Sequence, residues 1–270
     1  LFVILIAFCV RSLFLPGAKE GLSFLFHPDF SKIDSGVVLR AMGQAFFSLS
    51  LGMGTLITYA SYFSNKTSLP KTAVTVASLD TFVAVLAGVI IFPAVFSFGI
   101  SPSQGPELIF ITLPNVFQQI PGAYIWSVLF FVLITVAALT STISLCEVAI
   151  AFLHEEFHFT RRRASQILIF ICLVMSTLCS LSFGPLSDFY ILGFSIFNFC
   201  DFLASNILLH AGGMLISIFV GWKLDRQFIK EELSNHGVSR VWYFGILMFC
   251  MRFVAPVAIF LIFLSGLGLF

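Results

Sequence analysis

The sequence predicts an all-α protein that crosses a membrane several times. Of its 270 residues, 59% are hydrophobic and only 10% are charged, whereas a soluble domain carries about 25% charged residues. Apolar runs recur along the whole chain, and several of them reach the length of about 20 residues that a helix needs to cross a bilayer. Helices are expected because a spanning segment has to satisfy its own backbone hydrogen bonds. The lipid bilayer is therefore an expected partner.

Charge and cysteine content argue against two other classes of protein. The formal net charge is +1, and basic residues do not alternate with aromatic ones in any patch, so nucleic acid is not an expected partner. The six cysteines all lie in apolar segments and show no C-x-x-C spacing. We interpret them as small membrane-core residues rather than as disulfides or zinc ligands.

The stretch 43–62, GQAFFSLSLGMGTLITYASY, is poorly suited to a regular transmembrane helix. It lies in an uncharged run, yet Ser48, Ser50, Gly52 and Gly54 cluster in its middle. Each Gly costs about 1 kcal/mol relative to Ala inside a helix. Unwound backbone at membrane depth survives only where it lines a cavity in the protein. The stretch therefore indicates either a broken helix with a polar site at the break, or a helix packed closely through small residues.

The remaining elements follow from the apolar runs and the loop signals. We expect a first helix ending near Leu15, a polar loop over 16–35, and a short basic turn at 65–71. A helix over 72–98 should be kinked at Pro93. A folded loop with short helices is expected over 99–122. Further helices are expected over 123–152, 164–181, 195–222 and from 241 onward. Arg161–Arg163 should form a turn, a short loop should hold Pro185 and Asp188, and a charged loop should cover 223–240.

Basic residues are distributed unequally between the two sides of the predicted membrane. Alternate loops carry nine of them, against four in the opposite loops and helix ends. The positive-inside rule puts the richer set in the cytoplasm. That set comprises Lys66, Lys71, Arg161, Arg162, Arg163, Lys223, Arg226, Lys230 and Arg240.

Several polar residues occur where a membrane helix would be expected to be apolar. An ionisable group at membrane depth costs at least about 2.5 kcal/mol, so it needs a partner or a function. Asp80 could pair with a polar group of another helix or bind a cation, since hard cations prefer oxygen ligands. Thr140 and Ser141 could bond back to their own helix or face the interior. Asp201 could be a gating ion-pair partner or a carboxylate that complements a helix dipole.

Residues 154–158 match the zinc-protease motif H-E-x-x-H, in which two histidines one helical turn apart bind the metal. The match is short, and Arg161–Arg163 follow it closely, where concentrated positive charge opposes a divalent cation. We retain an intramembrane zinc protease built on His154, Glu155 and His158 as an alternative function. A membrane receptor or subunit that does not transport is a second alternative.

The stretch 43–62 resembles the sixth transmembrane helix of neurotransmitter:sodium symporters, especially of bacterial sodium-dependent amino-acid transporters. The resemblance continues through LDTFVAVLAGVIIFPAVFSFG, GPELIFITLP and LTSTISLCEVAIAFLHEEF, and more weakly through DFLASNILL. It implies a leucine-transporter-type fold with two inverted five-helix repeats. In this fold a discontinuous helix holds the substrate and the ions near the middle of the membrane. The chain would be one transporter domain over 1–270, a fragment from the end of helix five to helix eleven.

The resemblance also implies a substrate site and sodium sites. Phe47 resembles an aromatic lid over the substrate, and the other implied substrate contacts are Ser48, Ser50, Gly52, Met53, Ser141 and Leu145. Ser48 and Asp80 resemble one sodium site. Ala137, Thr140 and Ser141 resemble a second, so two sodium ions are expected. Asp80 stands where the leucine transporter has Asn. Ala84 stands four residues further on, where that transporter has Glu. The extra charge of Asp80 implies that chloride is not required.

Four further residues resemble gates. Gln44 and Asp201 match outer-gate positions, and Tyr62 and Glu155 match inner-gate positions. The resemblance implies a symporter, not an enzyme, in a bacterial plasma membrane. It would couple sodium entry to the uptake of neutral, hydrophobic or aromatic amino acids by alternating access.

Overall fold

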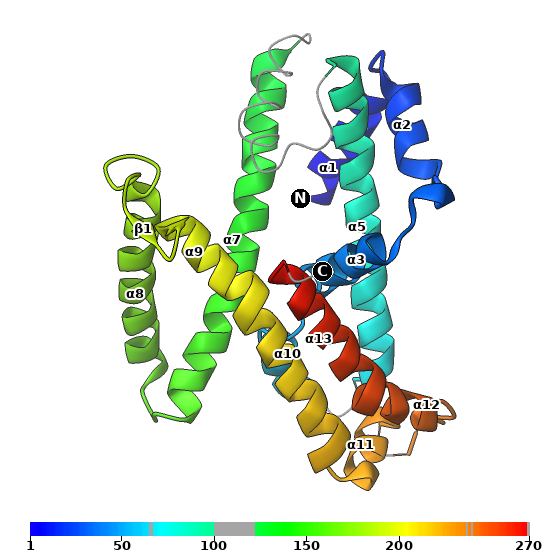
Figure 1. Ribbon diagram of the computed structural model, residues 1–270, viewed down its shortest axis with the longest axis vertical. Helices are drawn as coiled ribbons and strands as arrows, with labels where there is room; N and C mark the ends of the chain where they lie inside the picture. The colour runs from blue at the N-terminus through cyan, green and yellow to red at the C-terminus, as the bar shows by residue number, and fades with distance from the viewer. Residues whose placement is uncertain (65–66, 100–121, 236, 239, 269–270) are drawn as a thin grey trace. The chain divides into compact units, whose positions relative to one another are not determined.

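The computed structural model describes residues 1–64, 67–99, 122–235, 237–238 and 240–268 (Figure 1). The chain divides into two compact units. The first comprises Leu1–Lys32 and Val76–Ile143, and the second comprises Ile33–Thr75 and Ser144–Phe270. The folded loop that we predict over 99–122 falls, apart from its two end residues, outside the described residues.

The first unit contains α1 (Phe2–Leu13), α2 (Ala18–Phe26) and the short 3₁₀ helix η1 (Phe30–Lys32). It also holds most of α5 (Leu69–Ser97) and the first part of α7 (Ala123–Glu155). Its core joins α1, α5 and α7 through buried apolar side chains. These are Leu5, Phe8, Cys9, Ile90, Ala94, Phe130 and Leu133. The hydroxyl oxygen of Ser12 lies 2.8 Å from the carbonyl oxygen of Val89, so α1 also has a polar attachment to α5.

The prediction of a loop over 16–35 is wrong for residues 18–26, which form α2. Helix α2 lies beside α5 (Figure 1). A Cβ atom added at Gly17 would meet the backbone of Ser97, and one added at Gly21 would meet the backbone of Pro93. The Gly17 amide also donates to the Ser97 hydroxyl over 2.8 Å. Two glycines four residues apart thus let this helix approach α5 closely. In the sequence, the Gly, Pro and charged residues of this segment indicate a loop instead.

Five helices of the described residues are long and apolar enough to cross a membrane, or six if α1 and α2, bent by 113°, count as one broken span. The prediction of a polytopic helical membrane protein is thereby confirmed. Helices α5 and α7 begin and end within a few residues of their predicted limits. Arg161–Arg163 do not form a turn: they are the first turn of α8 (Arg161–Leu181), because Thr160 caps that helix with its side chain.

The second unit begins with α3 (Ser35–Ser48) and α4 (Thr55–Ser61) and continues after α8 with two long spans. The first span, Ile196–Lys223, comprises α9 (Ile196–Phe202), the π-helix η3 (Leu203–Leu208), α10 (Leu209–Ile218) and the π-helix η4 (Phe219–Lys223). The second comprises α12 (Phe244–Phe249), the π-helix η5 (Cys250–Val254) and α13 (Ala255–Gly266). Helices α10 and α13 lie side by side (Figure 1).

A short hairpin and a short helix also form at or beside predicted loops. Strands β1 (Tyr190–Ile191) and β2 (Phe194–Ser195) pair antiparallel around Leu192 and Gly193, which both have positive φ. A Leu in this conformation is no turn signal, so the hairpin escapes prediction. Helix α11 (Arg226–Leu233) occupies the predicted charged loop, because Asp225 accepts from the Gln227 amide and caps it.

Candidate functional site

The predicted broken helix is present, with its break at residues 49–54 between α3 and α4. Three residues of the break have positive φ: Ser50 at 52°, Gly52 at 91° and Gly54 at 79°. Glycine adopts this region freely, whereas Ser does so at a cost. The backbone turns back on α3 locally, since the amides of Ser50 and Leu51 donate to the carbonyls of Phe47 (2.9 Å) and Phe46 (3.0 Å).

Helix α10 packs directly on this break. A Cβ atom added at Gly212 would collide with the carbonyl oxygen of Gly52, and one added at Gly213 would collide with the Phe46 ring. Phe46, Leu209 and Ile259 form a buried cluster, against which Met53 packs half-buried. The glycine pair of α10 therefore provides the room that the unwound backbone needs.

Three predicted residues come together at one cavity of about 400 Å³ in the second unit. Gln44 and Phe47 reach it from α3, and Asp201 reaches it from α9. Phe47 is 48% exposed, as befits a side chain at the mouth of a cavity. The Ser205 hydroxyl donates to the Asp201 carboxylate over 3.1 Å. The structure thus groups the predicted outer-gate residues with the predicted lid, while the gating role itself stays a prediction.

Two residues of this cavity carry chemistry that we do not predict. Arg40 precedes Gln44 by four residues, which puts both on one face of α3. His210 is buried, lies with Nδ1 3.1 Å from the Asn206 carbonyl, and stacks on Phe46 with ring centroids 5.5 Å apart. Within the described residues its Nε2 atom has no hydrogen-bond partner. The four-residue spacing is the signal that could have identified Arg40, whereas nothing in the sequence shows that the ring of His210 reaches the cavity.

A second cavity of about 260 Å³ is lined by Ser50, Gly52 and Gly54 of the break. Gly213 and Ser217 of α10 line it as well. Ser48, the last residue of α3, is exposed. Of the substrate contacts predicted in the break, Ser50 and Gly52 therefore line a cavity.

The other predicted sodium ligands lie in the first unit. Asp80 is half-buried on α5, and Ala137, Thr140 and Ser141 are exposed on α7. The Thr140 hydroxyl donates to the Ala137 carbonyl over 2.8 Å. For Thr140 this bond is the back-bonding to its own helix that the sequence left open, so the sodium site at these residues stays a prediction. The grouping of Ser48 with Asp80 stays a prediction. Leu145, exposed on α7, likewise keeps its predicted role untested.

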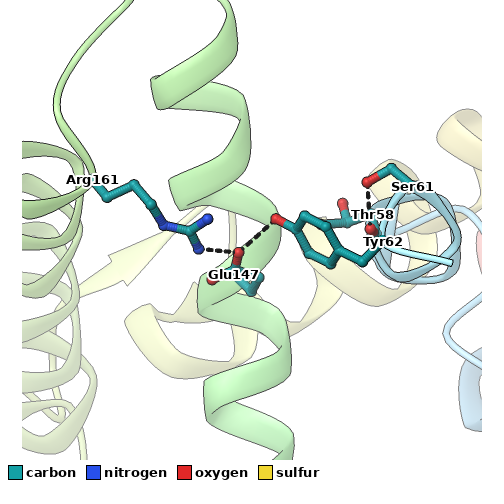
Figure 2. A network of polar contacts seen from close by, with 5 residues as sticks. All are labelled: Thr58, Ser61, Tyr62, Glu147 and Arg161. Carbon is teal, nitrogen blue, oxygen red and sulfur yellow. Dashed lines mark hydrogen bonds and ion pairs between the residues drawn. The ribbon is translucent and has the colours of Figure 1, made fainter. Parts of the chain in front are cut away.

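Glu147 holds three helices of the second unit together (Figure 2). The Tyr62 hydroxyl, at the end of α4, donates to its Oε1 atom over 2.7 Å. The Arg161 guanidinium, in the first turn of α8, donates to the same oxygen. The carboxylate that Tyr62 contacts is that of Glu147, two helical turns before Glu155, and the inner-gate role of Tyr62 and Glu155 stays a prediction. Glu155 itself is exposed at the end of α7.

The zinc alternative lacks the geometry that it needs. The motif requires both histidines on one helix, but α7 ends at Glu155 and His158 has a φ of 55°. The Nδ1 atom of His154 lies 2.7 Å from the Phe159 carbonyl oxygen. Among the residues that the structure describes, no group of three His, Cys, Asp or Glu side chains could hold a metal ion. The described geometry therefore does not support the intramembrane protease alternative.

Comparison with known proteins agrees with this geometry. A family model described as the sodium:neurotransmitter symporter family matches residues 1–270. The uncharacterized sodium-dependent transporter YhdH of Bacillus subtilis is 36% identical over all of the chain and 60% of its own length. An uncharacterized sodium-dependent transporter of Haemophilus influenzae is 38% identical over 99% of the chain and 58% of its own length. The chain thus spans about three fifths of these relatives.

A solved structure is also similar. The crystal structure of MhsT in complex with L-phenylalanine has a TM-score of 0.85 and 45% sequence identity, and the match covers 98% of this chain and 60% of that one. The similarity confirms the leucine-transporter-type fold. Members of the matched family are transporters rather than enzymes, and the chain is a multi-pass protein of the plasma membrane. The chain belongs to the sodium:neurotransmitter symporter family.

Proposed function

We propose that the protein containing this chain is a symporter that couples sodium entry to the uptake of a neutral amino acid. The break at residues 49–54 is the observation that carries the proposal. Its three positive φ values free backbone amides and carbonyls that a regular helix would use internally. Such groups can bind an amino group, a carboxylate or a cation at membrane depth. The family match supplies the reason to expect sodium.

A hydrophobic or aromatic amino acid is the substrate class that we favour. Phe47 would cover the substrate, Ser50 would meet its amino group, and Met53, Ser141 and Leu145 would line its side-chain pocket. Met53 supports tolerance of large side chains, because a thioether is flexible and fits irregular spaces. The related MhsT is known as a complex with L-phenylalanine, which agrees with this class.

Two sodium ions would accompany the substrate. One would bind Ser48 and Asp80, and the other would bind the Ala137 carbonyl, Thr140 and Ser141. A cation beside the substrate carboxylate lowers the cost of burying that negative charge. Asp80 would supply a fixed negative charge at the first site, so that chloride would not be required.

Coupling would arise from different affinities of two conformations for the same ligands. Sodium would favour the outward-open state, in which the cavity of Gln44, Phe47 and Asp201 gives access to the substrate. Closure of that cavity and opening of the inner side would then release the sodium ions and the amino acid into the cell. The hydrogen-bonded group of Tyr62, Glu147 and Arg161 would hold the inner side closed.

Uptake into proteoliposomes tests this proposal. The purified whole protein should accumulate labelled phenylalanine, tryptophan or leucine against a gradient when sodium is present outside, and it should stop when potassium replaces sodium. Unlabelled amino acids then compete in turn. Competition by glycine or alanine alone would reject the hydrophobic substrate class. Sodium-dependent binding without accumulation would instead favour a receptor.

A further inference from the structure

A positively charged cavity of about 770 Å³ lies between α11 and the start of α12. Arg226, Gln227, Lys230 and Ser234 line it from α11 and its end, and Phe244 lines it from α12. Residues four apart lie on one face of a helix, so the two cations and the serine form a row along α11. The cavity thus combines a cationic wall with an aromatic one.

The two cations of this cavity are available for a ligand. Ion pairs among the described residues join Lys32 to Asp29 and Arg161 to Glu147, and neither Arg226 nor Lys230 takes part in one. Among the described lining residues, the one carboxylate is that of Glu231, which accepts from the side-chain amide of Gln227 over 2.9 Å. A guanidinium and an ammonium one turn apart match a phosphate group, which Arg binds in a bidentate manner and Lys binds as a point charge.

The surroundings of the cavity favour a lipid over a dissolved phosphate. Helix α11 connects two membrane spans that end at Lys223 and begin at Phe244. Trp222 and Trp242 flank it with exposed fractions of 57% and 84%, and Trp is enriched where a membrane meets water. Phe228, on the face of α11 opposite the cations, is 52% exposed. The excess of basic residues assigns this end to the cytoplasm, where the leaflet is anionic.

We propose that this cavity binds the phosphate of an anionic membrane phospholipid. Arg226 and Lys230 would hold the phosphate, and the Phe244 ring would pack against the glycerol and the first acyl carbons. Helix α11 then lies in the membrane interface, with Phe228 turned toward the acyl chains. The site holds α11 against the bilayer while the two spans that it connects move.

Retention of lipid by the detergent-purified whole protein tests the site, with native mass spectrometry as the readout. Phosphatidylglycerol and phosphatidylcholine are added separately to delipidated protein. Each basic residue near a membrane surface contributes about fivefold in binding, so the double variant Arg226→Gln/Lys230→Gln should lose roughly 25-fold in affinity for phosphatidylglycerol. The charge-preserving variant Arg226→Lys/Lys230→Arg should retain most of it. Phe244→Ala should lower the affinity for both lipids. Each of these losses should be smaller than the loss of phosphatidylglycerol affinity in the double variant.

A matched control removes the same charge elsewhere. Arg162→Gln/Arg163→Gln, in the exposed first turn of α8, also deletes two cations at a cytoplasmic helix end. It should leave phosphatidylglycerol retention within about twofold of wild type. Equal losses in the two double variants would overturn the proposal, because binding would then reflect general charge. So would equal retention of phosphatidylcholine, or displacement of the lipid by millimolar inorganic phosphate.

Discussion

The Tyr62 hydroxyl donates a hydrogen bond to the Glu147 carboxylate over 2.7 Å, although the two residues are 85 positions apart in the chain. Arg161 donates to the same carboxylate oxygen from the start of α8. One side chain of α7 therefore connects the second half of the broken helix with the next span. Because Glu147 is the shared acceptor, its loss frees both donors, whereas the loss of Tyr62 leaves the ion pair with Arg161 in place.

Glu147→Ala should shift the transporter toward its inward-open state and lower sodium-driven uptake at least about fivefold, a typical coupling effect. Tyr62→Phe should have a smaller effect in the same direction. A double-mutant cycle of the two should be non-additive, since they share one contact. Uptake rates and the labelling of a cysteine introduced on the inner side provide the measurement.

Tyr59→Phe is the matched control for that cycle. Tyr59 also lies on α4, and its hydroxyl donates to the uncharged Ser144 hydroxyl over 2.7 Å. The variant removes an equivalent hydroxyl without touching the carboxylate. If it reduces uptake as much as Glu147→Ala, the carboxylate has no special role in closing the inner side.

Gly213→Ala should destabilise the second unit by about 1–3 kcal/mol, because its new methyl group would meet the buried Phe46 ring. Gly245→Ala is the control. A methyl group there meets nothing within 4 Å, and replacing a helical Gly stabilises by about 0.5–1 kcal/mol. Thermal unfolding in detergent, followed by tryptophan fluorescence, compares them. A neutral Gly213→Ala variant would show that α10 does not need close contact with the break.

Sequence patterns predict the long elements well and the short ones poorly. Helices α5 and α7 follow from apolar runs that can only be membrane spans, and the break follows from small residues in such a run. Helices α2 and α11 lie in segments that are read as loops from Gly, Pro and charge. Helix α2 exists because Gly17 and Gly21 fit against α5, and tertiary packing of that kind has no local signature.

The candidate site divides in the same way. Gln44, Phe47 and Asp201 are predicted from a resemblance, and the structure brings them to one cavity. The partner of Tyr62 is not predicted, because the carboxylate that Tyr62 meets depends on where α4 ends beside α7. Arg161 is missed because three consecutive arginines indicate a turn, whereas the Thr160 cap converts them into a helix start.

Ser50→Gly should separate the backbone role of the break from its side-chain role. Ser50 has a φ of 52°, a conformation that costs a non-glycine residue about 1 kcal/mol. The variant should therefore leave thermal stability unchanged or raise it, and still weaken amino-acid binding if the hydroxyl meets the substrate. Equilibrium binding of labelled phenylalanine and thermal unfolding measure the two effects. Unchanged binding would remove the Ser50 hydroxyl from the substrate site.

Thr140→Val should raise the sodium concentration needed for half-maximal substrate binding by about tenfold, equivalent to about 1.4 kcal/mol. The substitution keeps the shape of the side chain and removes one proposed oxygen ligand. Thr142→Val is the matched control, since the Thr142 hydroxyl donates to the Ala138 carbonyl of its own helix over 2.8 Å. Equal sodium dependence in the two variants would argue against a sodium site at Thr140.

Asp80→Asn should make uptake depend on chloride. If Asp80 supplies the fixed negative charge beside the first sodium ion, its neutral isostere leaves a site that an external anion has to complete. Ala84 lies one turn further along α5, on the same face, so Asp80→Asn/Ala84→Glu should restore the charge and with it chloride-independent uptake. Both variants are measured in proteoliposomes with chloride or gluconate as the anion. An Asp80→Asn protein that transports equally well in gluconate would show that the Asp80 charge does not replace chloride. If the double variant does not recover chloride-independent uptake, the negative charge has to stand at position 80.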